Sequence, residues 1–348
     1  MRITIALSGL IFGLVFTQHS LAESVIDLAY RLKASVVKVH VATKNGGHGV
    51  GTGVVVGKDL VATNCHVLAN STGVKITKFG DSSAPVALKA DWKHDLCILR
   101  FQYLDLKPVV LGDSEQLKYE SPIFSIGFPG GPPKPQVTEG KIKALYKMED
   151  SQIVRTDASF VMGASGSPVF DSEGKLVAIS TFKSPGHNAY YYNLPVKWVK
   201  TLMEMPESAE TVSMMSEETP FWNLSEQNRP FYMRVVLPFQ NDKWDDLNIV
   251  AQDWVKKEPN CAEAHYYFAV AQENLGNKNV AKQSYAQSLK LHPNHPASLI
   301  ALGLLANKEG NVAEVERLKV TMKESNPDVL EDFKVALDPH ANEPPEAK

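Results

Sequence analysis

The sequence predicts a multidomain protein of the β + α class, in which an all-β barrel or sandwich precedes a region of α-helices. Short runs rich in β-branched residues, separated by Gly, Pro, Asn and Asp, fill residues 36–192, which is typical of a barrel or sandwich. Beyond residue 228 the chain has helical character and contains an internal repeat. With 348 residues, the chain is long enough for two folded units.

The first 22 residues are predicted to be a signal peptide. Met1-Arg2 precedes an apolar run from Ile3 to Phe16, and Ser20-Leu21-Ala22 supplies small residues at the positions that a signal peptidase recognises. The alternative is a membrane anchor, but the run is shorter than the ~20 apolar residues that span a bilayer. We therefore expect cleavage after Ala22, a periplasmic or secreted protein, and no membrane span in the mature chain.

Residues 23–205 are predicted to form the β domain, and residues 206–227 a linker. The runs that we expect to be strands are Ser35–Thr43, Gly51–Val56, Val74–Thr77, Leu96–Phe101, Pro122–Ile126 and Leu176–Phe182. Between Pro206 and Pro220 the sequence becomes polar and acidic, and apolar residues do not recur on one face. This composition is typical of a linker between two domains.

Residues 228–330 are predicted to form an α-helical solenoid of repeats. Pro259, Pro293 and Pro327 recur every 34 residues, and Gly276 and Gly310 keep the same interval. This is the period of tetratricopeptide (TPR) repeats, each of which is a pair of helices. The alternative is a general bundle of helical hairpins, but the shared register of the prolines and glycines favours the TPR-like solenoid. A polar tail is expected over residues 331–348.

Three short motifs place residues with hydrolytic chemistry beside predicted strands. His66 directly follows one strand, Asp95 opens another, and Ser165 lies in the turn Gly163-Ala164-Ser165-Gly166. Each residue alone has an ordinary structural explanation, as a core histidine, a turn aspartate or a loop serine. Their joint occurrence, in this order and in these contexts, indicates a shared role.

These motifs resemble those of the trypsin-like serine peptidases, and most closely their bacterial Deg/HtrA branch, over roughly residues 35–200. The resemblance implies a trypsin-like double β-barrel with a catalytic triad of His66, Asp95 and Ser165. A serine hydroxyl is a weak nucleophile near neutral pH, so His66 would accept its proton and Asp95 would orient His66. The backbone N–H groups of Gly163 and Ser165 would form the oxyanion hole.

The resemblance also implies which residues bind the side chain that precedes the cleaved bond. These residues are Phe160, Val161, Met162, Ile179, Ser180 and Thr181, with Phe182 beside them. None of them is acidic, so we expect a small or medium apolar substrate side chain. The Pro-rich loop over residues 128–135 corresponds to an activity-gating loop in related enzymes, and a rigid surface turn is an equally good interpretation.

The composition argues against several other classes of function. A net charge of −3 creates no strong field of one sign, so we expect no nucleic-acid partner. No spacing of His and Cys residues suggests a metal site, and no cofactor is expected. Of the three cysteines, Cys65 and Cys97 would be brought together by the triad, either as a disulfide or as free thiols; Cys261 would be left over.

The predicted function is that of an exported serine endopeptidase acting on unfolded or extended protein chains. The repeats would bind substrate or a protein partner, or mediate self-association. In TPR arrays the first helices line the concave face, and here the corresponding residues are Glu263, Tyr266, Val270, Glu273, Ala297, Ile300, Leu304 and Asn307. This mostly apolar face would suit an extended apolar segment; coverage of the face by the linker, by the tail after Leu337 or by a second subunit is an equally good interpretation. The alternative is a catalytically silent barrel that serves as a binding protein.

Overall fold

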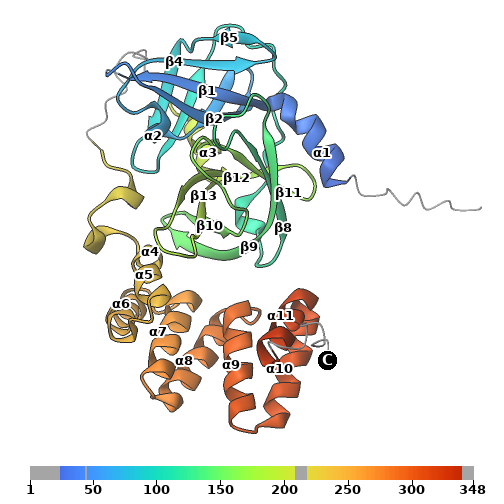
Figure 1. Ribbon diagram of the computed structural model, residues 1–348, viewed down its shortest axis with the longest axis vertical. Coiled ribbons are helices and arrows are strands. Elements are labelled where there is room, and N and C mark those ends of the chain that lie inside the picture. The colour runs from blue at the N-terminus through green and yellow to red at the C-terminus, as the bar shows by residue number, and fades with distance from the viewer. Residues whose placement is uncertain (1–23, 44, 208–217, 339–348) are drawn as a thin grey trace, which may run out of the picture.

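The computed structural model describes residues 24–43, 45–207 and 218–338 of the chain. In Figure 1 the strands form two neighbouring units and the C-terminal helices lie in a row beside the second unit. The predicted order, a β domain followed by helices, is confirmed. The predicted signal peptide and part of the predicted linker, residues 208–217, lie outside the described residues.

The first β unit is a seven-stranded antiparallel sheet with the order β5-β4-β1-β2-β3-β7-β6. Its strands are β1 (Val36–Thr43), β2 (His48–Gly57), β3 (Leu60–Thr63), β4 (Ser71–Lys78), β5 (Asp81–Ser83), β6 (Ala87–Asp91) and β7 (Leu96–Arg100). In β1, Val37, Val39 and Val41 are buried, whereas Lys38 and His40 between them are partly exposed. This alternation matches the two-residue period of a strand, so one face of β1 packs into the core of this unit.

The second β unit is a closed barrel with the order β10-β13-β12-β11-β8-β9. Its strands are β8 (Pro122–Gly127), β9 (Gln136–Met148), β10 (Ser151–Thr156), β11 (Pro168–Asp171), β12 (Leu176–Lys183) and β13 (Tyr191–Pro195). Closure leaves no unpaired sheet edge. Both units of the predicted double β-barrel are therefore present, the first as an open sheet and the second as a closed barrel.

Three short helices accompany the β units: α1 (Val25–Leu32), α2 (Cys65–Leu68) and α3 (Val196–Glu204). The helix α1 begins where the Ser24 side chain accepts a hydrogen bond from the Asp27 backbone N–H, which is a standard N-cap. Its buried residues Leu28 and Leu32 join the core of the barrel. In the same part of the chain, η1 (Lys33–Ser35) and η2 (Ser114–Gln116) are single 3₁₀ turns.

The C-terminal region is helical from residue 231 to residue 337. It contains α4 (Phe231–Arg234), α5 (Val236–Gln240), α6 (Trp244–Lys257), α7 (Ala262–Asn274), α8 (Lys278–Leu291), α9 (Pro296–Lys308), α10 (Val312–Ser325) and α11 (Pro327–Leu337). Gly276 and Gly310 follow the C-caps of α7 and α9 with φ values of +86° and +71°, a left-handed conformation that glycine adopts most readily. The helical character is confirmed; the assignment to TPR-like repeats stays a prediction.

An aromatic cluster joins the barrel to the first C-terminal helices. Tyr146 of β9 stacks on Tyr232 of α4 with ring centroids 4.4 Å apart, and Trp254 of α6 lies 6.5 Å from the same Tyr146 ring. All three side chains are buried and belong to one continuous core that runs from α1 through the barrel to α8. Burial of large aromatic rings is a major source of packing energy, so the barrel and the first C-terminal helices stabilise each other.

A buried polar cluster lies at the same interface. Glu263 of α7 is only 4% exposed, and one of its carboxylate oxygens accepts a hydrogen bond from the Tyr119 hydroxyl at 2.9 Å. His295 Nε2 lies 3.2 Å from that oxygen. Burial alone would raise the pKa of Glu263, but His295, Arg155 and the Tyr119 hydroxyl outweigh this effect and lower the pKa. The carboxylate therefore stays ionised at the interface.

This interface corrects the expectation that α7 presents an open ligand face. Glu263 was expected on a concave binding surface, but it is buried against Tyr119 of the second β unit. Tyr266, expected on the same surface, packs against Tyr267 and His295 with centroids 5.2 and 5.4 Å away. The prediction was wrong at Glu263 because periodicity shows which residues share a helix face, but not which other domain covers that face.

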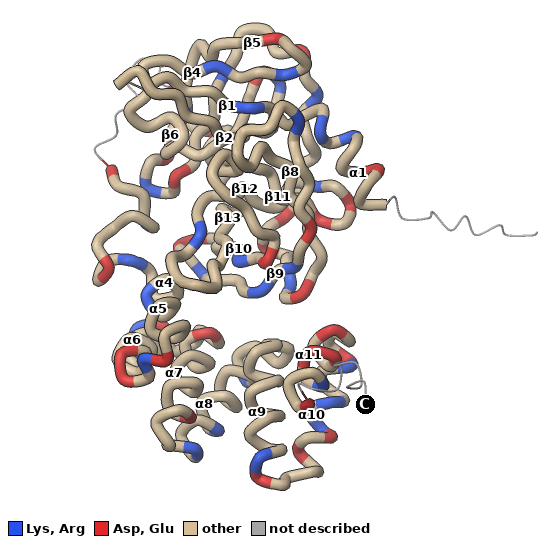
Figure 2. Tube along the Cα trace, viewed as in Figure 1, with Lys and Arg blue, Asp and Glu red and all other residues tan. Residues whose placement is uncertain are grey.

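The distribution of charged residues along the described chain agrees with the small net charge of −3. Figure 2 shows acidic and basic residues interspersed over the β units and the helices, with no large region of one sign. In residues 24–43, 45–207 and 218–338, no helix combines the length and the apolar character that crossing a bilayer requires.

Candidate active site

His66 and Asp95 face each other across the end of the first sheet. His66 belongs to α2, which starts immediately after β3, and Asp95 occupies the turn before β7 with a φ of +60°. His66 Nδ1 lies 2.7 Å from Asp95 Oδ2, and the His66 backbone N–H donates to Asp95 Oδ1 at 2.8 Å. Because a carboxylate only accepts, Nδ1 of a neutral His66 must carry the hydrogen, which leaves Nε2 as a proton acceptor.

A disulfide joins α2, which carries His66, to β7, which directly follows Asp95. In the antiparallel pairing of β3 with β7, Thr63 lies opposite Cys97, and Cys97 is bonded to Cys65, the neighbour of His66. The possibility of a bridge between these two cysteines is therefore realised in the structure. Cys261 is a free thiol, and burial raises its pKa to about 12, so it is not an activated nucleophile.

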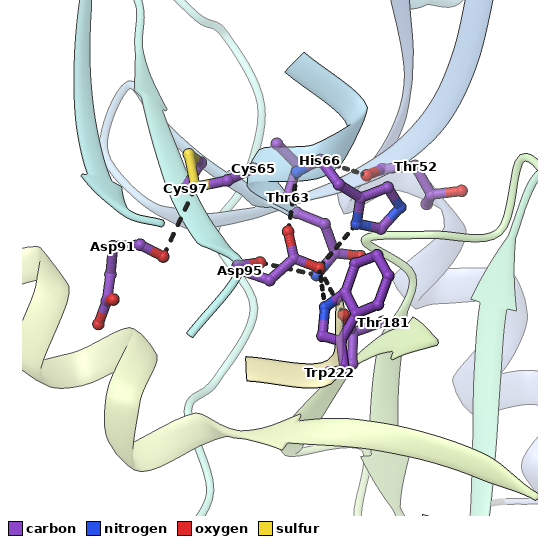
Figure 3. Close-up of polar contacts among 10 residues, drawn as sticks. Thr52, Thr63, Cys65, His66, Asp91, Asp95, Cys97, Thr181 and Trp222 are labelled. Carbon is purple, nitrogen blue, oxygen red and sulfur yellow. Dashed lines mark hydrogen bonds and ion pairs between the residues drawn. A yellow bond between two sulfur atoms is a disulfide. The ribbon is translucent and has the colours of Figure 1, made fainter. Parts of the chain in front are cut away.

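Asp95 is almost completely buried, at 1% exposure, and its carboxylate accepts hydrogen bonds from three residues (Figure 3). Besides His66, the Thr181 hydroxyl donates to Oδ2 at 2.7 Å and the Trp222 indole Nε1–H donates to Oδ2 at 3.0 Å. A buried charge needs such partners to offset its desolvation. These donors fix the orientation of the carboxylate toward His66.

The turn that contains Ser165 is anchored to the middle of β2. The Thr52 backbone N–H donates to the Ser165 carbonyl at 2.8 Å. A Cβ atom placed on the preceding Gly51 would lie 2.6 Å from Val67, the neighbour of His66, and 3.3 Å from the Ser165 carbonyl. Only glycine allows this close approach, so the serine turn and the helix of His66 both pack closely against Gly51.

Two backbone donors beside the serine hydroxyl have no acceptor among the described residues. The Ala164 N–H donates to the Val161 carbonyl and the Gly166 N–H donates to the Ser180 carbonyl, whereas the Gly163 and Ser165 N–H groups make no hydrogen bond within the described part of the chain. The Ser165 hydroxyl likewise makes no hydrogen bond within the described part of the chain. Unpaired N–H groups at this spacing are available to bind an oxyanion.

The loop over residues 128–135 contacts the serine turn directly. The Gly130 N–H donates to the Met162 carbonyl at 2.6 Å. Because the C=O and N–H of a trans peptide point in opposite directions, this bond turns the Gly163 N–H away from the loop. Gly163 itself has a φ of +92°, and a Cβ there would lie 2.4 Å from the Phe128 carbonyl. The loop therefore fixes the orientation of one candidate oxyanion donor.

The residues predicted to line a substrate pocket lie in two different environments. Val161 and Met162 are 53% and 89% exposed, and Phe160 is partly exposed. Ile179, Ser180 and Thr181 are buried in β12. The Thr181 hydroxyl donates a hydrogen bond to Asp95, so Thr181 contributes to the candidate site by binding this carboxylate. The substrate pocket stays a prediction.

Other features of the described surface do not belong to this site. A hollow of about 910 Å³ lies on the outer side of the first sheet, between Tyr30, Lys78, Phe79 and the loop at Pro133, and no candidate triad residue lines it. Within the described ranges there is no group of three or more His, Cys, Asp or Glu side chains that could hold a metal ion.

Sequence reasoning missed two residues that contact Asp95. Thr181 was assigned to a substrate pocket, and Trp222 lay in a segment interpreted as a linker. The only signal for Trp222 was the pair Phe221-Trp222, the two aromatic residues of the predicted linker over residues 206–227.

The sequence is similar to known peptidase domains. A family model described as "Trypsin-like peptidase domain" matches residues 51–179. The chain is 34% identical over 136 residues to the anti-sigma-I factor RsgI9 of Acetivibrio thermocellus, covering 38% of this chain and 19% of that protein. It is 27% identical over 156 residues to a "Probable periplasmic serine endoprotease DegP-like" of Halomonas elongata, covering 42% of this chain and 33% of that protein.

Among solved structures, the HtrA-type protease AlgW with tripeptide matches with a TM-score of 0.48 and 22% identity, over 52% of this chain and 63% of that one. The chain spans about a fifth to a third of the length of the curated relatives it matches. The range matched by the family model includes His66, Asp95 and Ser165. Residues 51–179 thus match a trypsin-like peptidase domain, HtrA-like and DegP-like proteases are among the relatives of the chain, and a helical region follows.

Proposed function

We propose that this protein is an exported serine endopeptidase that uses Ser165 as nucleophile, His66 as general base and Asp95 as the residue that orients His66. The observation that carries the proposal is the 2.7 Å hydrogen bond between His66 and the buried Asp95, together with a serine turn whose Gly163 and Ser165 N–H groups have no acceptor among the described residues. A serine with only a structural role needs neither an imidazole–carboxylate pair nor two free backbone N–H groups.

The proposed reaction follows from the hydrogen-bond roles in the site. Ser165 Oγ attacks the peptide carbonyl carbon while its proton passes to His66 Nε2, and the carbonyl π electrons move onto the oxygen. The N–H groups of Gly163 and Ser165 stabilise this oxyanion. The intermediate then expels the amine, which takes the proton from His66, and leaves an acyl-enzyme. Water, activated by His66 in the same way, hydrolyses the acyl-enzyme and frees Ser165.

The Cys65–Cys97 bond supports a periplasmic or secreted location, because disulfides persist in oxidising compartments. The relative from Halomonas elongata carries a periplasmic description, which agrees with this proposal. We propose unfolded or extended protein as the substrate class, with a small or medium apolar residue before the cleaved bond. The helical region, with one part of its predicted ligand face covered, would contact substrate or partner through its remaining surface.

Incubation with unfolded casein tests the proposed function. The wild-type protein is expected to cut casein at internal bonds, and mass spectrometry of early products should show new termini within the chain. Ser165→Ala, purified in parallel, is expected to leave casein intact because it lacks the nucleophilic oxygen. Equal casein cleavage by Ser165→Ala, or no cleavage by either protein, would contradict the proposal; in the second case, a binding role for the barrel would be favoured.

A further inference from the structure

Trp222 reaches the candidate triad from outside the two β units. It lies in η3 (Phe221–Asn223), 127 residues after Asp95, where the chain passes from the peptidase domain to the C-terminal helices. Its indole Nε1–H donates to Asp95 Oδ2 at 3.0 Å, the oxygen that also accepts the His66 Nδ1 hydrogen bond. Figure 3 shows the indole beside both the carboxylate and the imidazole.

The position of the indole is fixed on several sides. Its ring stacks on Phe182 of β12, with centroids 5.7 Å apart and an interplanar angle of 19°. It meets the His66 ring edge to face, at 5.5 Å and 84°. The preceding residue, Phe221, is buried at 3% exposure, and its backbone N–H donates to the Lys93 carbonyl at 3.0 Å. A ring anchored in this way holds its N–H at Asp95 without a large entropic cost.

These contacts act on the His66–Asp95 pair in two ways. The indole N–H gives Oδ2 a further donor, in addition to those of His66 and Thr181, and so limits rotation of the carboxylate. The ring covers one side of His66, which keeps water from competing for the hydrogen bond between imidazole and carboxylate. Correct orientation of the base is what the aspartate of a triad supplies.

We propose that Trp222 is a positioning residue for catalysis, so that the segment leading into the helical region completes the active site. Trp222 acts through Asp95 and not on the substrate. This inference rests on the proposed function, because it has meaning only if His66 acts as a base. It also gives a role to one of the two aromatic residues of the predicted linker over residues 206–227.

The test compares Trp222→Phe with wild type, using the full chain and a short chromogenic ester. Phenylalanine keeps an aromatic ring against Phe182 but removes the N–H donor. Since a hydrogen bond to a charged group contributes strongly, kcat is expected to fall about tenfold, with KM and the melting temperature unchanged. Trp222→Ala, which also uncovers His66, is expected to lower kcat further than Trp222→Phe. Trp254→Phe is the matched control, because it removes an indole N–H bound to Glu258 away from the triad, and should retain wild-type kcat.

A double-mutant comparison shows whether the effect passes through Asp95. In an Asp95→Asn background, Trp222→Phe is expected to change the rate of Ser165 labelling by a fluorophosphonate less than twofold, because the carboxylate it supports is gone. Unchanged or increased kcat in Trp222→Phe would overturn the inference, as would a loss of kcat that occurs only with a matching fall in melting temperature or an equal loss in Trp254→Phe. Labelling of wild-type Ser165 in the same assay distinguishes failure of this inference from failure of the proposed function. If wild-type Ser165 is not labelled, the proposed function itself fails.

Discussion

Asp95→Asn is expected to lower kcat about 10⁴-fold while the protein stays folded. The asparagine amide has the shape of the carboxylate, but one of its oxygens is replaced by an NH₂ group. Here Oδ1 accepts the His66 backbone N–H, and Oδ2 accepts from the His66 ring, Thr181 and Trp222. Either orientation of the amide therefore turns its NH₂ group toward a donor. With NH₂ at Oδ2, His66 Nδ1 must become the acceptor, and its protonated Nε2 cannot take the Ser165 proton.

Steady-state kinetics on a short ester, with circular dichroism as the folding check, measures this effect. Asp91→Asn offers a matched control, because Asp91 pairs with His94 at 2.6 Å in the same turn and has no contact with His66. We expect Asp91→Asn to keep kcat close to that of wild type. Similar losses in both variants would mean that the turn, and not the His66–Asp95 pair, determines the rate.

Gly166→Ala is expected to reduce kcat/KM by about 100-fold or more, the loss that a 1 Å misplacement of a reacting group can cause. Gly166 directly follows Ser165 and has a φ of +87°. A Cβ atom at this position would lie 2.1 Å from the Thr52 carbonyl oxygen and 2.6 Å from Thr63 Oγ1. Because the Thr52 oxygen is backbone and Thr63 is buried, neither can move aside easily. The turn that holds Ser165 must shift instead.

Gly276→Ala separates this collision from the cost of the backbone conformation. Gly276 has nearly the same φ, +86°, but a Cβ there meets nothing within 4 Å. Alanine in the left-handed region costs about 1–2 kcal/mol, so this variant is expected to be slightly less stable and fully active. Differential scanning calorimetry and ester kinetics on both variants check the prediction. It fails if Gly166→Ala keeps wild-type kcat/KM, or if Gly276→Ala loses activity to the same degree.

The β-to-α order of the fold and the candidate site residues could be predicted from the sequence because their signals are local. His66, Asp95 and Ser165 each stand in a short motif next to a strand, and alternation within single strands is visible in segments such as β1. The spacing of Gly276 and Gly310 likewise marks helix ends in the structure. Each of these features depends on a few neighbouring residues.

The contacts that the sequence did not reveal join residues far apart in the chain. Trp222 supports Asp95 across 127 residues, and the composition of its segment resembled a linker. Glu263 was expected on an open helix face, yet its partner is Tyr119, 144 residues earlier. Periodicity and composition describe one segment at a time, whereas these contacts depend on how the helical region docks on the barrel.

Peptide mapping of a fluorophosphonate adduct shows whether Ser165 is the activated nucleophile. The reagent forms a stable bond to a serine oxygen only where a base removes its proton. One adduct is expected, on the peptide that contains Ser165, formed in wild type and absent from His66→Ala. An adduct on another residue, or equal labelling of Ser165 in His66→Ala, would contradict this role of Ser165.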